Sequence, residues 1–476
     1  MKYWQTTLMI LLSITLLILS TACDSSNENV QTDGDTETDA EIQLDGDADD
    51  DLETELDSDF ETDTDSEVEL EAEEQEPVCI APVQIRELDN NPDMTFDFGP
   101  YLMQPQQNSI IVMWHTLESY DGTVLYGVGD ELDQSVSQDG ASTIHEIKLE
   151  NLEPDTRYSY KVRSAHKTSD VHHFHTAPGA EQGFNIVMWG DSQDNPHIFA
   201  KLVDHMVTMN PHFALGMGDH VSEGGEWPQW KERLFDPARA MLHEVGFYAA
   251  IGNHARNHQN WYDLMSFPHP EDNPQHESFY SFTYGNAFFL VIDTDKPYFS
   301  IAGIDTEISA FINEQVKSPE AQAATWRFAV SHVPGYAEAW GDAECESYGG
   351  DLAIREWLYD LLNENKFHAH FSGHMHGYER GQSGNLMTII NGGGGGGLDS
   401  WCVDLPQVSV VNYEHHHLYM EVGCDTVKIS AYHMDGQKFD WLEINADDYG
   451  TIVDEGPIDD LPDPPVDPNS PTLIED

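Results

Sequence analysis

The chain has 476 residues, which is enough for two or three domains. It carries 87 Asp and Glu against 20 Lys and Arg, a formal net charge of −67 at pH 7. Because so acidic a chain is repelled by phosphate backbones, we expect no nucleic-acid binding.

The first 23 residues have the pattern of a secretory signal peptide. Lys2 precedes an apolar run from Leu8 to Leu19, and the small residues Ser20 and Ala22 follow it. The run is too short for a comfortable membrane span. Ala22-Cys23 also resembles the lipidation site of bacterial lipoproteins, although Ser20 departs from the Leu preferred there. We therefore expect an extracytoplasmic protein, either anchored to a membrane by lipid on Cys23 or secreted after ordinary cleavage behind Ala22.

Two acidic segments flank the parts that we expect to fold. Residues 24–79 form the first, with 25 acidic residues and no Lys or Arg between Asp24 and Glu76. Few apolar side chains are present to build a core, and like charges extend the chain, so we interpret the segment as a disordered tether. It lacks the regular Gly and bidentate Glu of calcium loops. Residues 446–476 are acidic and rich in Pro, and we expect a disordered tail.

Residues 80–178 have the pattern of an all-β domain. The predicted strands are Ser109–Trp114, Thr123–Val128, Thr143–Leu149 and Arg157–Val162. The spacing of Leu152, Pro154, Thr156 and Tyr158 resembles the corner motif of fibronectin type III sandwiches, in which the Tyr hydroxyl bonds back to the loop. We expect a fibronectin type III-like sandwich without catalytic residues. His172, His173 and His175 are interpreted as surface histidines.

Residues 183–445 contain five apolar runs that predict buried strands, each followed by residues able to bind metal. The runs are Phe184–Trp189, Phe213–Met217, Phe247–Ile251, Trp326–Val330 and Phe367–Phe371. They lead, in this order, to Asp191, Asp219, Asn253, His332, and the pair His374 and His376. In open α/β sheets such strand ends gather at the carboxyl edge, so we expect these side chains to meet there.

The order of these motifs resembles that of the calcineurin-like metallophosphoesterase superfamily. The stretch Gly-His-Met-His-Gly-Tyr-Glu-Arg, from Gly373 to Arg380, is most similar to the purple acid phosphatase branch. Pro100-Tyr101-Leu102 matches the opening of that branch's N-terminal domain. The resemblance implies a metallophosphoesterase domain built as a two-sheet β sandwich flanked by helices. The residues alone support an α/β domain, whose clearest helix is expected over Asp351–Lys366.

The resemblance also implies a centre of two metal ions. The first ion would take Asp191, His376 and a bridging Asp219. The second would share Asp219 and take Asn253, His332 and His374. Two carboxylates leave the site positive, which suits a phosphate ester.

Two positions near the first metal depart from the family. Gln193 stands where many relatives have a histidine ligand, so it is either a weak ligand or the holder of a bound water. Ser222 stands where purple acid phosphatases have the tyrosinate that colours them, three residues after the bridging Asp. A serine hydroxyl is too weak an acid to replace tyrosinate on ferric iron, so we expect divalent Mn, Zn or Fe and a protein that is not purple. Tyr378 is the alternative tyrosine.

The implied activity is a phosphoesterase in which a hydroxide bridging the two ions attacks phosphorus. His254 is the candidate to protonate the leaving group or hold the phosphoryl oxygens, and His220 is a weaker candidate for a contact that supports a metal ligand or touches the substrate. Each can instead be a loop histidine packed against ligands. We favour a small phosphomonoester as substrate, with a diester as the alternative. A non-catalytic surface binding protein on the same scaffold is the other class left open.

Cysteines and glycines receive no catalytic role. If Cys23 is lipidated, the remaining four cysteines allow three disulfide pairings, and we favour Cys345 with Cys402 over pairings that use Cys79 or Cys424. The run Gly392–Gly397 lacks the Lys-Ser/Thr of a nucleotide-binding loop. It is either a place of close packing beside the metal loops or a flexible rim of the site.

Overall fold

The computed structural model describes residues 96–180, 182–269, 277–294, 306–340, 349–446 and 448–457. The expected signal peptide with Cys23, the acidic tether, Cys79 and Cys345 lie outside these ranges, and so does most of the expected tail. The favoured Cys345–Cys402 pairing therefore stays a prediction. Within the described ranges, no helix combines the length and the apolar character needed to cross a bilayer.

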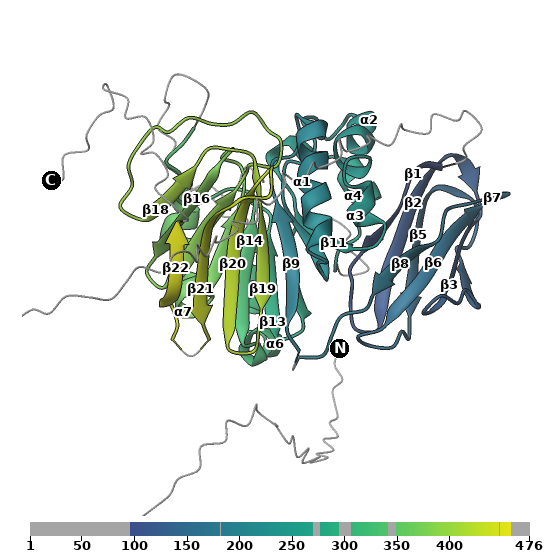
Figure 1. Cartoon of the computed structure of the whole chain (residues 1–476), viewed down its shortest axis with the longest axis horizontal. Coiled ribbons are helices and arrows are strands. Elements are labelled where there is room, and N and C mark those ends of the chain that lie inside the picture. The colour runs from purple at the N-terminus through teal and green to yellow at the C-terminus, as the bar shows by residue number, and fades with distance from the viewer. Residues whose placement is uncertain are drawn as a thin grey trace, which may run out of the picture. The chain divides into compact units, whose positions relative to one another are not determined.

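The described chain contains three β-sheets (Figure 1). The largest has ten strands in the order β22-β21-β20-β19-β9-β10-β11-β1-β2-β5. Its strands are β1 Phe96–Met103, β2 Ser109–Tyr120, β5 Ser142–Glu150, β9 Phe184–Trp189, β10 Phe213–Met217, β11 Gly246–Ala250, β19 His416–Val422, β20 Thr426–His433, β21 Lys438–Asn445 and β22 Ile452–Pro457. At its centre β9, β10 and β11 run parallel.

A second sheet has seven strands in the order β12-β13-β14-β15-β17-β16-β18. These are β12 Tyr280–Tyr284, β13 Ala287–Ile292, β14 Trp326–Ser331, β15 Ala369–Ser372, β16 Tyr378–Ser383, β17 Leu386–Asn391 and β18 Val408–Asn412. It stacks on the ten-stranded sheet through aromatic rings: Phe282 lies 3.7 Å from Tyr248, and Phe289 lies 5.6 Å from Phe213, between ring centroids. These contacts place the main core between the two sheets.

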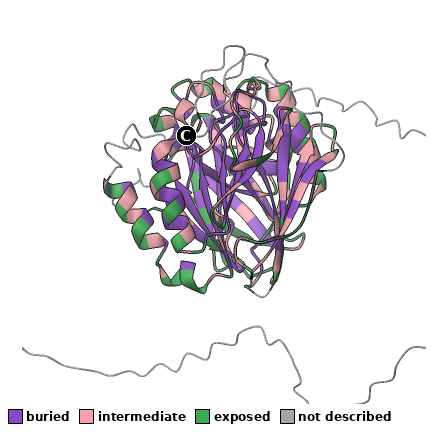
Figure 2. Ribbon diagram, turned by 90° about the vertical axis from the view of Figure 1, so that its left-hand side faces the viewer, coloured by how far each residue is buried: buried purple, intermediate pink, exposed green. Residues whose placement is uncertain are grey.

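Helices cover the outer faces of the two stacked sheets. On the ten-stranded sheet lie α1 Pro196–Thr208, α2 Trp227–Gln229, α3 Arg239–Leu242 and α4 Gln259–Leu264, with a π-helical turn over Trp230–Phe235. On the seven-stranded sheet lie α5 Thr306–Gln315, α6 Pro319–Ala323 and α7 Tyr359–Glu364, the last preceded by a π-helical turn over Ile354–Leu358. Figure 2 shows buried residues concentrated on the strands and exposed residues on the outward faces of helices. The expected two-sheet sandwich flanked by helices is confirmed.

The N-terminal all-β sandwich is also confirmed. The third sheet consists of β3 Gly122–Val128, β4 Gln134–Ser137, β6 Arg157–Ser164, β7 Lys167–Thr168 and β8 His172–His175. The four strands predicted from the sequence are present as β2, β3, β5 and β6. The corner motif forms as expected, since the backbone N–H of Glu153 donates to the hydroxyl oxygen of Tyr158 at 2.8 Å.

The sandwich is joined to the second domain by a shared sheet, which the sequence did not indicate. Strand β1 pairs in parallel with β11, with Met103 opposite Phe247. The Tyr160 hydroxyl donates to the carbonyl oxygen of His243 at 2.6 Å. The N-terminal domain is therefore continuous with the sheet that carries Asp191 and Asp219.

The expectation of a disordered tail from residue 446 is wrong for residues 452–457. These residues form β22, which pairs antiparallel with β21. Glu455 on β22 accepts a hydrogen bond of 2.6 Å from Arg380, whose side chain is only 1% exposed. A buried guanidinium requires carboxylate partners, and this need explains why so acidic a segment is ordered.

Candidate metal centre

The five predicted strands are confirmed as β9, β10, β11, β14 and β15, but they belong to two different sheets. Strands β9, β10 and β11 bring Asp191, Asp219 and Asn253 from the ten-stranded sheet, whereas β14 and β15 bring the histidines from the seven-stranded sheet. Asp191, Asp219 and His374 have φ angles of 58°, 48° and 71°. Residues other than Gly rarely adopt this left-handed backbone conformation. The resulting strain persists where the surrounding structure enforces it, which is common at functional sites.

Three side chains converge on Nε2 of His332. This nitrogen lies 3.0 Å from Oδ2 of Asp219, 3.0 Å from Oδ1 of Asn253 and 3.2 Å from Nδ1 of His374. The ligand atoms of Asp219, His332 and His374 all lie within 4.8 Å of one another. These are the residues that we expected around the second ion.

The hydrogen bonds of His332 determine which of its nitrogens faces the centre. Nδ1 lies 2.8 Å from the carbonyl oxygen of Met217, so Nδ1 carries the hydrogen and Nε2 is left to bind metal. Burial lowers the pKa of His332, but the carboxylates of Asp219 and Asp191 outweigh burial and raise it to about 10. The surroundings of Nε2 thus favour positive charge, as a metal site requires.

A second group of side chains lies around His376. Its Nδ1 donates to the carbonyl oxygen of Gly397 at 2.6 Å, so that Nε2 faces Oδ1 of Asp191 at 3.5 Å. That carboxylate oxygen is buried and has no hydrogen-bond partner. An unpaired buried carboxylate oxygen is costly unless a cation binds there, so this group also fits a metal ion.

Gln193 lies beside His376, as we expected for a residue near the first ion. It is 1% exposed. When its amide nitrogen donates to the carbonyl oxygens of Asp191 at 3.1 Å and Asp219 at 2.8 Å, its oxygen faces Nε2 of His376 at 3.2 Å. This oxygen is placed to bind an ion or a water molecule.

The glycine run packs closely beside these loops, as one of the two sequence interpretations expected. The backbone N–H of Gly394 donates to the carbonyl oxygen of Gly190 at 2.9 Å, and that of Gly396 donates to Asp191 at 2.7 Å. A Cβ on Gly392 would lie 1.9 Å from the carbonyl oxygen of Met375. A larger residue at position 392 would therefore push the glycine run away from the loop that carries His374 and His376.

His254 lies at the edge of the centre. Its Nδ1 donates to the carbonyl oxygen of Ser222 at 2.7 Å, and its Nε2 lies 3.9 Å from Oδ2 of Asp219. The side chain is 39% exposed. This orientation leaves Nε2 accessible to a substrate.

The proposed substrate contact of His220 is wrong. The residue is 2% exposed, and its ring packs beside those of Trp189 and Phe247 at centroid distances of 5.9 and 5.7 Å. A Cβ on Gly216 would lie 2.5 Å from the ring, so the glycine makes room for it. His220 is therefore packed in the core, and neither of its ring nitrogens forms a hydrogen bond to a candidate ligand.

Two residues that contact the candidate ligands were missed from the sequence. Oδ2 of Asp399 accepts a hydrogen bond of 2.7 Å from the backbone N–H of His376. The ring of Trp340 lies 4.9 Å from that of His374, between centroids. Asp399 lies two residues after the glycine run and could have been singled out, whereas no motif marks Trp340.

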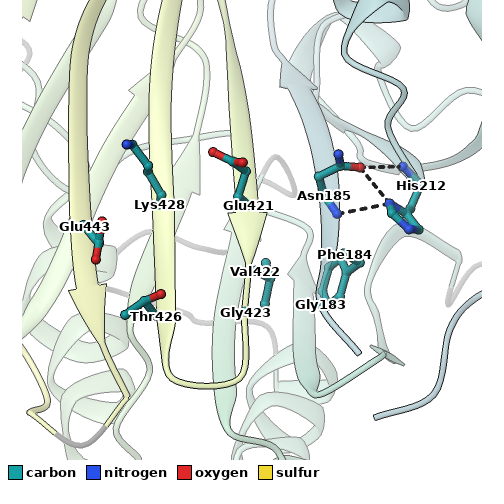
Figure 3. A pocket seen from close by; sticks show the side chains of 10 residues that line it. All are labelled: Gly183, Phe184, Asn185, His212, Glu421, Val422, Gly423, Thr426, Lys428 and Glu443. Atoms are coloured by element: carbon teal, nitrogen blue, oxygen red, sulfur yellow. Dashed lines mark hydrogen bonds between the residues drawn. The ribbon is translucent and has the colours of Figure 1, made fainter. Parts of the chain in front are cut away.

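A surface pocket lies away from this centre (Figure 3). Its lining includes Phe184 at the start of β9 and Val422 at the end of β19. Asp191 follows the opposite end of β9. The pocket therefore belongs to the amino edge of the parallel strands, and no candidate ligand lines it.

Two protein-family models match consecutive parts of the chain. The purple acid phosphatase N-terminal domain matches residues 100–176, and the calcineurin-like phosphoesterase family matches residues 168–378. The first match covers most of the β sandwich. The second includes every candidate ligand from Asp191 to His376.

Known proteins similar to this chain include purple acid phosphatases. The chain is 21% identical over 321 residues to purple acid phosphatase 23 of Arabidopsis thaliana, covering 59% of this chain and 64% of that relative. It thus spans less than two thirds of the relative's length. A purple acid phosphatase from yellow lupin (Lupinus luteus) seeds superposes with a TM-score of 0.63 at 18% identity, covering 73% and 74% of the two chains. The structure of PhoD superposes with a TM-score of 0.60 at 13% identity, covering 76% and 92%.

Proposed function

The chain belongs to the calcineurin-like phosphoesterases and carries the N-terminal domain of purple acid phosphatases, and from this premise we propose that it hydrolyses phosphate esters at a centre of two divalent metal ions. The proposed ligands are Asp191, Gln193, Asp219, Asn253, His332, His374 and His376. Mn, Zn and Fe are the metals expected for this mixture of oxygen and imidazole donors.

One observation carries the proposal: donor atoms from both sheets converge on the carboxyl edge. His332 Nε2 lies 3.0 Å from both Asp219 and Asn253, and the buried Oδ1 of Asp191 faces His376. All seven proposed ligands keep a donor atom, and this argues against the alternative of a non-catalytic binding protein on a degenerate esterase scaffold. Two divalent ions against the charges of Asp191 and Asp219 would leave the site positive, which favours an anionic phosphate.

The proposed chemistry divides between the ions and the chain. When bound, two ions would lower the pKa of a shared water to make a nucleophile and would stabilise charge on the ester oxygens. His254 is fixed by its bond to Ser222, with Nε2 towards Asp219. From this position it can give a proton to the leaving group or donate to a phosphoryl oxygen.

The substrate class is tested with p-nitrophenyl phosphate and bis(p-nitrophenyl) phosphate as a monoester and a diester. We expect metal-dependent turnover that is faster for the monoester and is lost in His374→Ala. His166→Ala, at an exposed position on the sandwich, is the control and should keep full activity. Faster turnover of the diester would identify a phosphodiesterase. Metal-bound protein without turnover of either ester would favour the binding-protein alternative.

We propose an extracytoplasmic location for this activity. The support is the apolar run Leu8–Leu19 followed by Ala22-Cys23, with an acidic segment behind it. Acyl chains on Cys23 would hold the protein on a membrane, and residues 24–79 would separate it from the surface. Cell fractionation of wild type and Cys23→Ser tests the anchor: we expect release of the variant, and a wild-type protein that is already fully soluble would refute the lipid.

A further inference from the structure

The loop of residues 331–335 begins with the last residue of β14 and carries His332. Hydrogen bonds fix this loop at several points. Val333 N–H donates to Oγ1 of Thr294 at 3.0 Å, and the carbonyl oxygen of Pro334 accepts from Asp351 N–H at 2.9 Å.

A buried histidine that the proposed mechanism does not use lies beneath this loop. His370 on β15 is 0% exposed, and both of its ring nitrogens have partners. Nε2 lies 2.8 Å from Oγ of Ser331, and Nδ1 lies 3.2 Å from the hydroxyl of Tyr359. Burial lowers the pKa of His370 to about 3, so the ring is neutral, with one donor and one acceptor nitrogen.

One assignment of hydrogens satisfies every contact of this network. Gly335 N–H donates to the hydroxyl oxygen of Tyr359 at 3.0 Å, and that hydroxyl donates to Nδ1 of His370. His370 donates through Nε2 to Ser331, whose own hydroxyl donates to the carbonyl oxygen of Val333 at 3.0 Å. The network therefore binds the loop at its first, third and fifth residues, on both sides of His332.

Close packing strengthens this arrangement. A Cβ on Gly335 would lie 2.6 Å from the ring of Tyr359, so only glycine lets the loop approach the tyrosine so closely. The carbonyl oxygen of His332 accepts from the backbone N–H of Gly373 at 2.9 Å. This hydrogen bond joins the loop that carries His332 to the loop that carries His374. The second loop directly follows β15, the strand that carries His370.

We propose that Ser331, Tyr359 and His370 are positioning residues for the second metal ion. They act through the loop of residues 331–335 by holding Nε2 of His332 at its distances from Asp219, Asn253 and His374. The inference rests on the proposed function only in that His332 binds a metal ion. Networks that orient the ligands of a metal contribute to its affinity, because a loose ligand must be ordered when the ion binds.

The test compares two substitutions that each remove one buried hydroxyl. Tyr359→Phe removes the bond to His370 and Gly335, whereas Tyr101→Phe removes a hydroxyl that donates to Leu264 at 2.9 Å on the other sheet. His370→Ala is avoided because a cavity in the core can prevent folding. Binding of Mn²⁺ to chelator-treated protein is measured by calorimetry, unfolding by circular dichroism, and turnover of p-nitrophenyl phosphate over a range of Mn²⁺.

We expect both variants to unfold at a similar midpoint, about 2–4 °C below wild type. Only Tyr359→Phe should weaken binding of the second Mn²⁺ ion, by about tenfold, the lower end of what the loss of a ligand's support costs. Its turnover should fall at limiting Mn²⁺ and recover at saturating Mn²⁺, with KM for the ester unchanged. Ser331→Ala should behave in the same way.

The outcomes separate this inference from the proposed function. Equal Mn²⁺ binding by wild type, Tyr359→Phe and Ser331→Ala would overturn the inference and leave the phosphoesterase proposal standing. Equal loss of Mn²⁺ affinity in Tyr101→Phe would also overturn it, because the effect would then follow from stability alone. A wild-type protein that binds no Mn²⁺, Zn²⁺ or Fe²⁺ would overturn the proposed function and the inference together.

Discussion

The hydroxyl of Tyr378 donates a hydrogen bond of 2.6 Å to Oδ2 of Asp440, and both side chains are buried, at 1% and 0% exposure. The Tyr378 ring packs edge-on against His416 and Phe439, at centroid distances of 5.5 and 5.2 Å. Although Tyr378 follows His376 by only two residues, its hydroxyl is bound to Asp440 and not directed to the metal centre. Tyr378, the alternative iron ligand suggested by the sequence, therefore has its hydroxyl bound to Asp440 and does not contact the metal centre.

This contact predicts that the iron-loaded, oxidised protein is not purple. Ser222 occupies the place of the family's tyrosinate, and its hydroxyl donates to Oδ1 of Asp194 at 2.7 Å. We expect no strong visible charge-transfer band in an absorption spectrum, and identical spectra for wild type and Tyr378→Phe. A band that disappears in Tyr378→Phe would show that the first metal site is wrongly assigned.

A second prediction concerns Gln193. Because imidazole is a stronger donor than an amide oxygen towards Zn or Fe, Gln193→His should raise the affinity for the first ion. The expected gain is about tenfold, the scale on which changes around metal ligands alter affinity. Gln193→Leu, which offers no donor atom, should weaken the same ion. Metal titrations that leave both variants at wild-type affinity would show that Gln193 does not contact the ion or its water.

A third prediction concerns the C-terminal strand. Arg380 bonds to Asp440 through Nε at 2.7 Å and to Glu455 on β22 at 2.6 Å. Asp440→Ala should destabilise the fold by about 3–5 kcal/mol, because it leaves a buried guanidinium without its main partner. Glu455→Gln should cost about 1 kcal/mol, since Glu455 is 48% exposed.

Denaturant unfolding measures these costs. Asp454→Asn is the matched control for Glu455→Gln, because Asp454 is an exposed acidic residue of the same strand. It should leave stability within about 0.5 kcal/mol of wild type. An equal effect of Asp454→Asn and Glu455→Gln would mean that β22 responds to net charge and not to the bond with Arg380.

A fourth prediction concerns pH. Burial raises the pKa of Glu379 to about 8 from 4.5, although the backbone N–H groups of Glu338 and Ala339 oppose the shift. The folded chain thus keeps a proton that the unfolded chain releases. The stability provided by protonated Glu379 is complete below pH 4.5 and is lost as the pH rises through about 8.

Glu379→Gln should remove this dependence. Its unfolding midpoint, relative to wild type, should rise between pH 5 and pH 8 by about 2 °C or more. Glu320→Gln, at an exposed position on α6, should show no such trend. Parallel pH profiles for Glu379→Gln and wild type would rule out a buried proton on Glu379.

The local elements and the candidate ligands could be predicted because both follow from short-range patterns. Phe184–Trp189 and Phe213–Met217 are strands with the predicted bounds, and Asp191 and Asp219 follow them as expected. A buried apolar run followed by Gly-Asp specifies a strand and a turn regardless of the rest of the chain.

Contacts between distant segments could not be predicted in the same way. The placement of β9 and β14 in different sheets depends on pairing between segments far apart in the sequence, such as Met188 of β9 opposite Leu418 of β19, and such pairing leaves no local pattern. Strand β22 was missed because its acidic composition is typical of disorder, and its order depends on Arg380. His220 was misplaced because a motif gives the position of a residue along the chain but not the direction of its side chain.

The most direct test of the dinuclear phosphoesterase is to titrate chelator-treated protein with Mn²⁺ or Zn²⁺ while measuring both bound metal and hydrolysis of p-nitrophenyl phosphate. For the wild-type protein, in which Asp191, Asp219 and His374 are intact, we predict no turnover without metal. Full turnover should appear only as the bound metal approaches two ions per chain. Turnover that persists in chelator, or that is complete with a single bound ion, would contradict a centre of two metal ions.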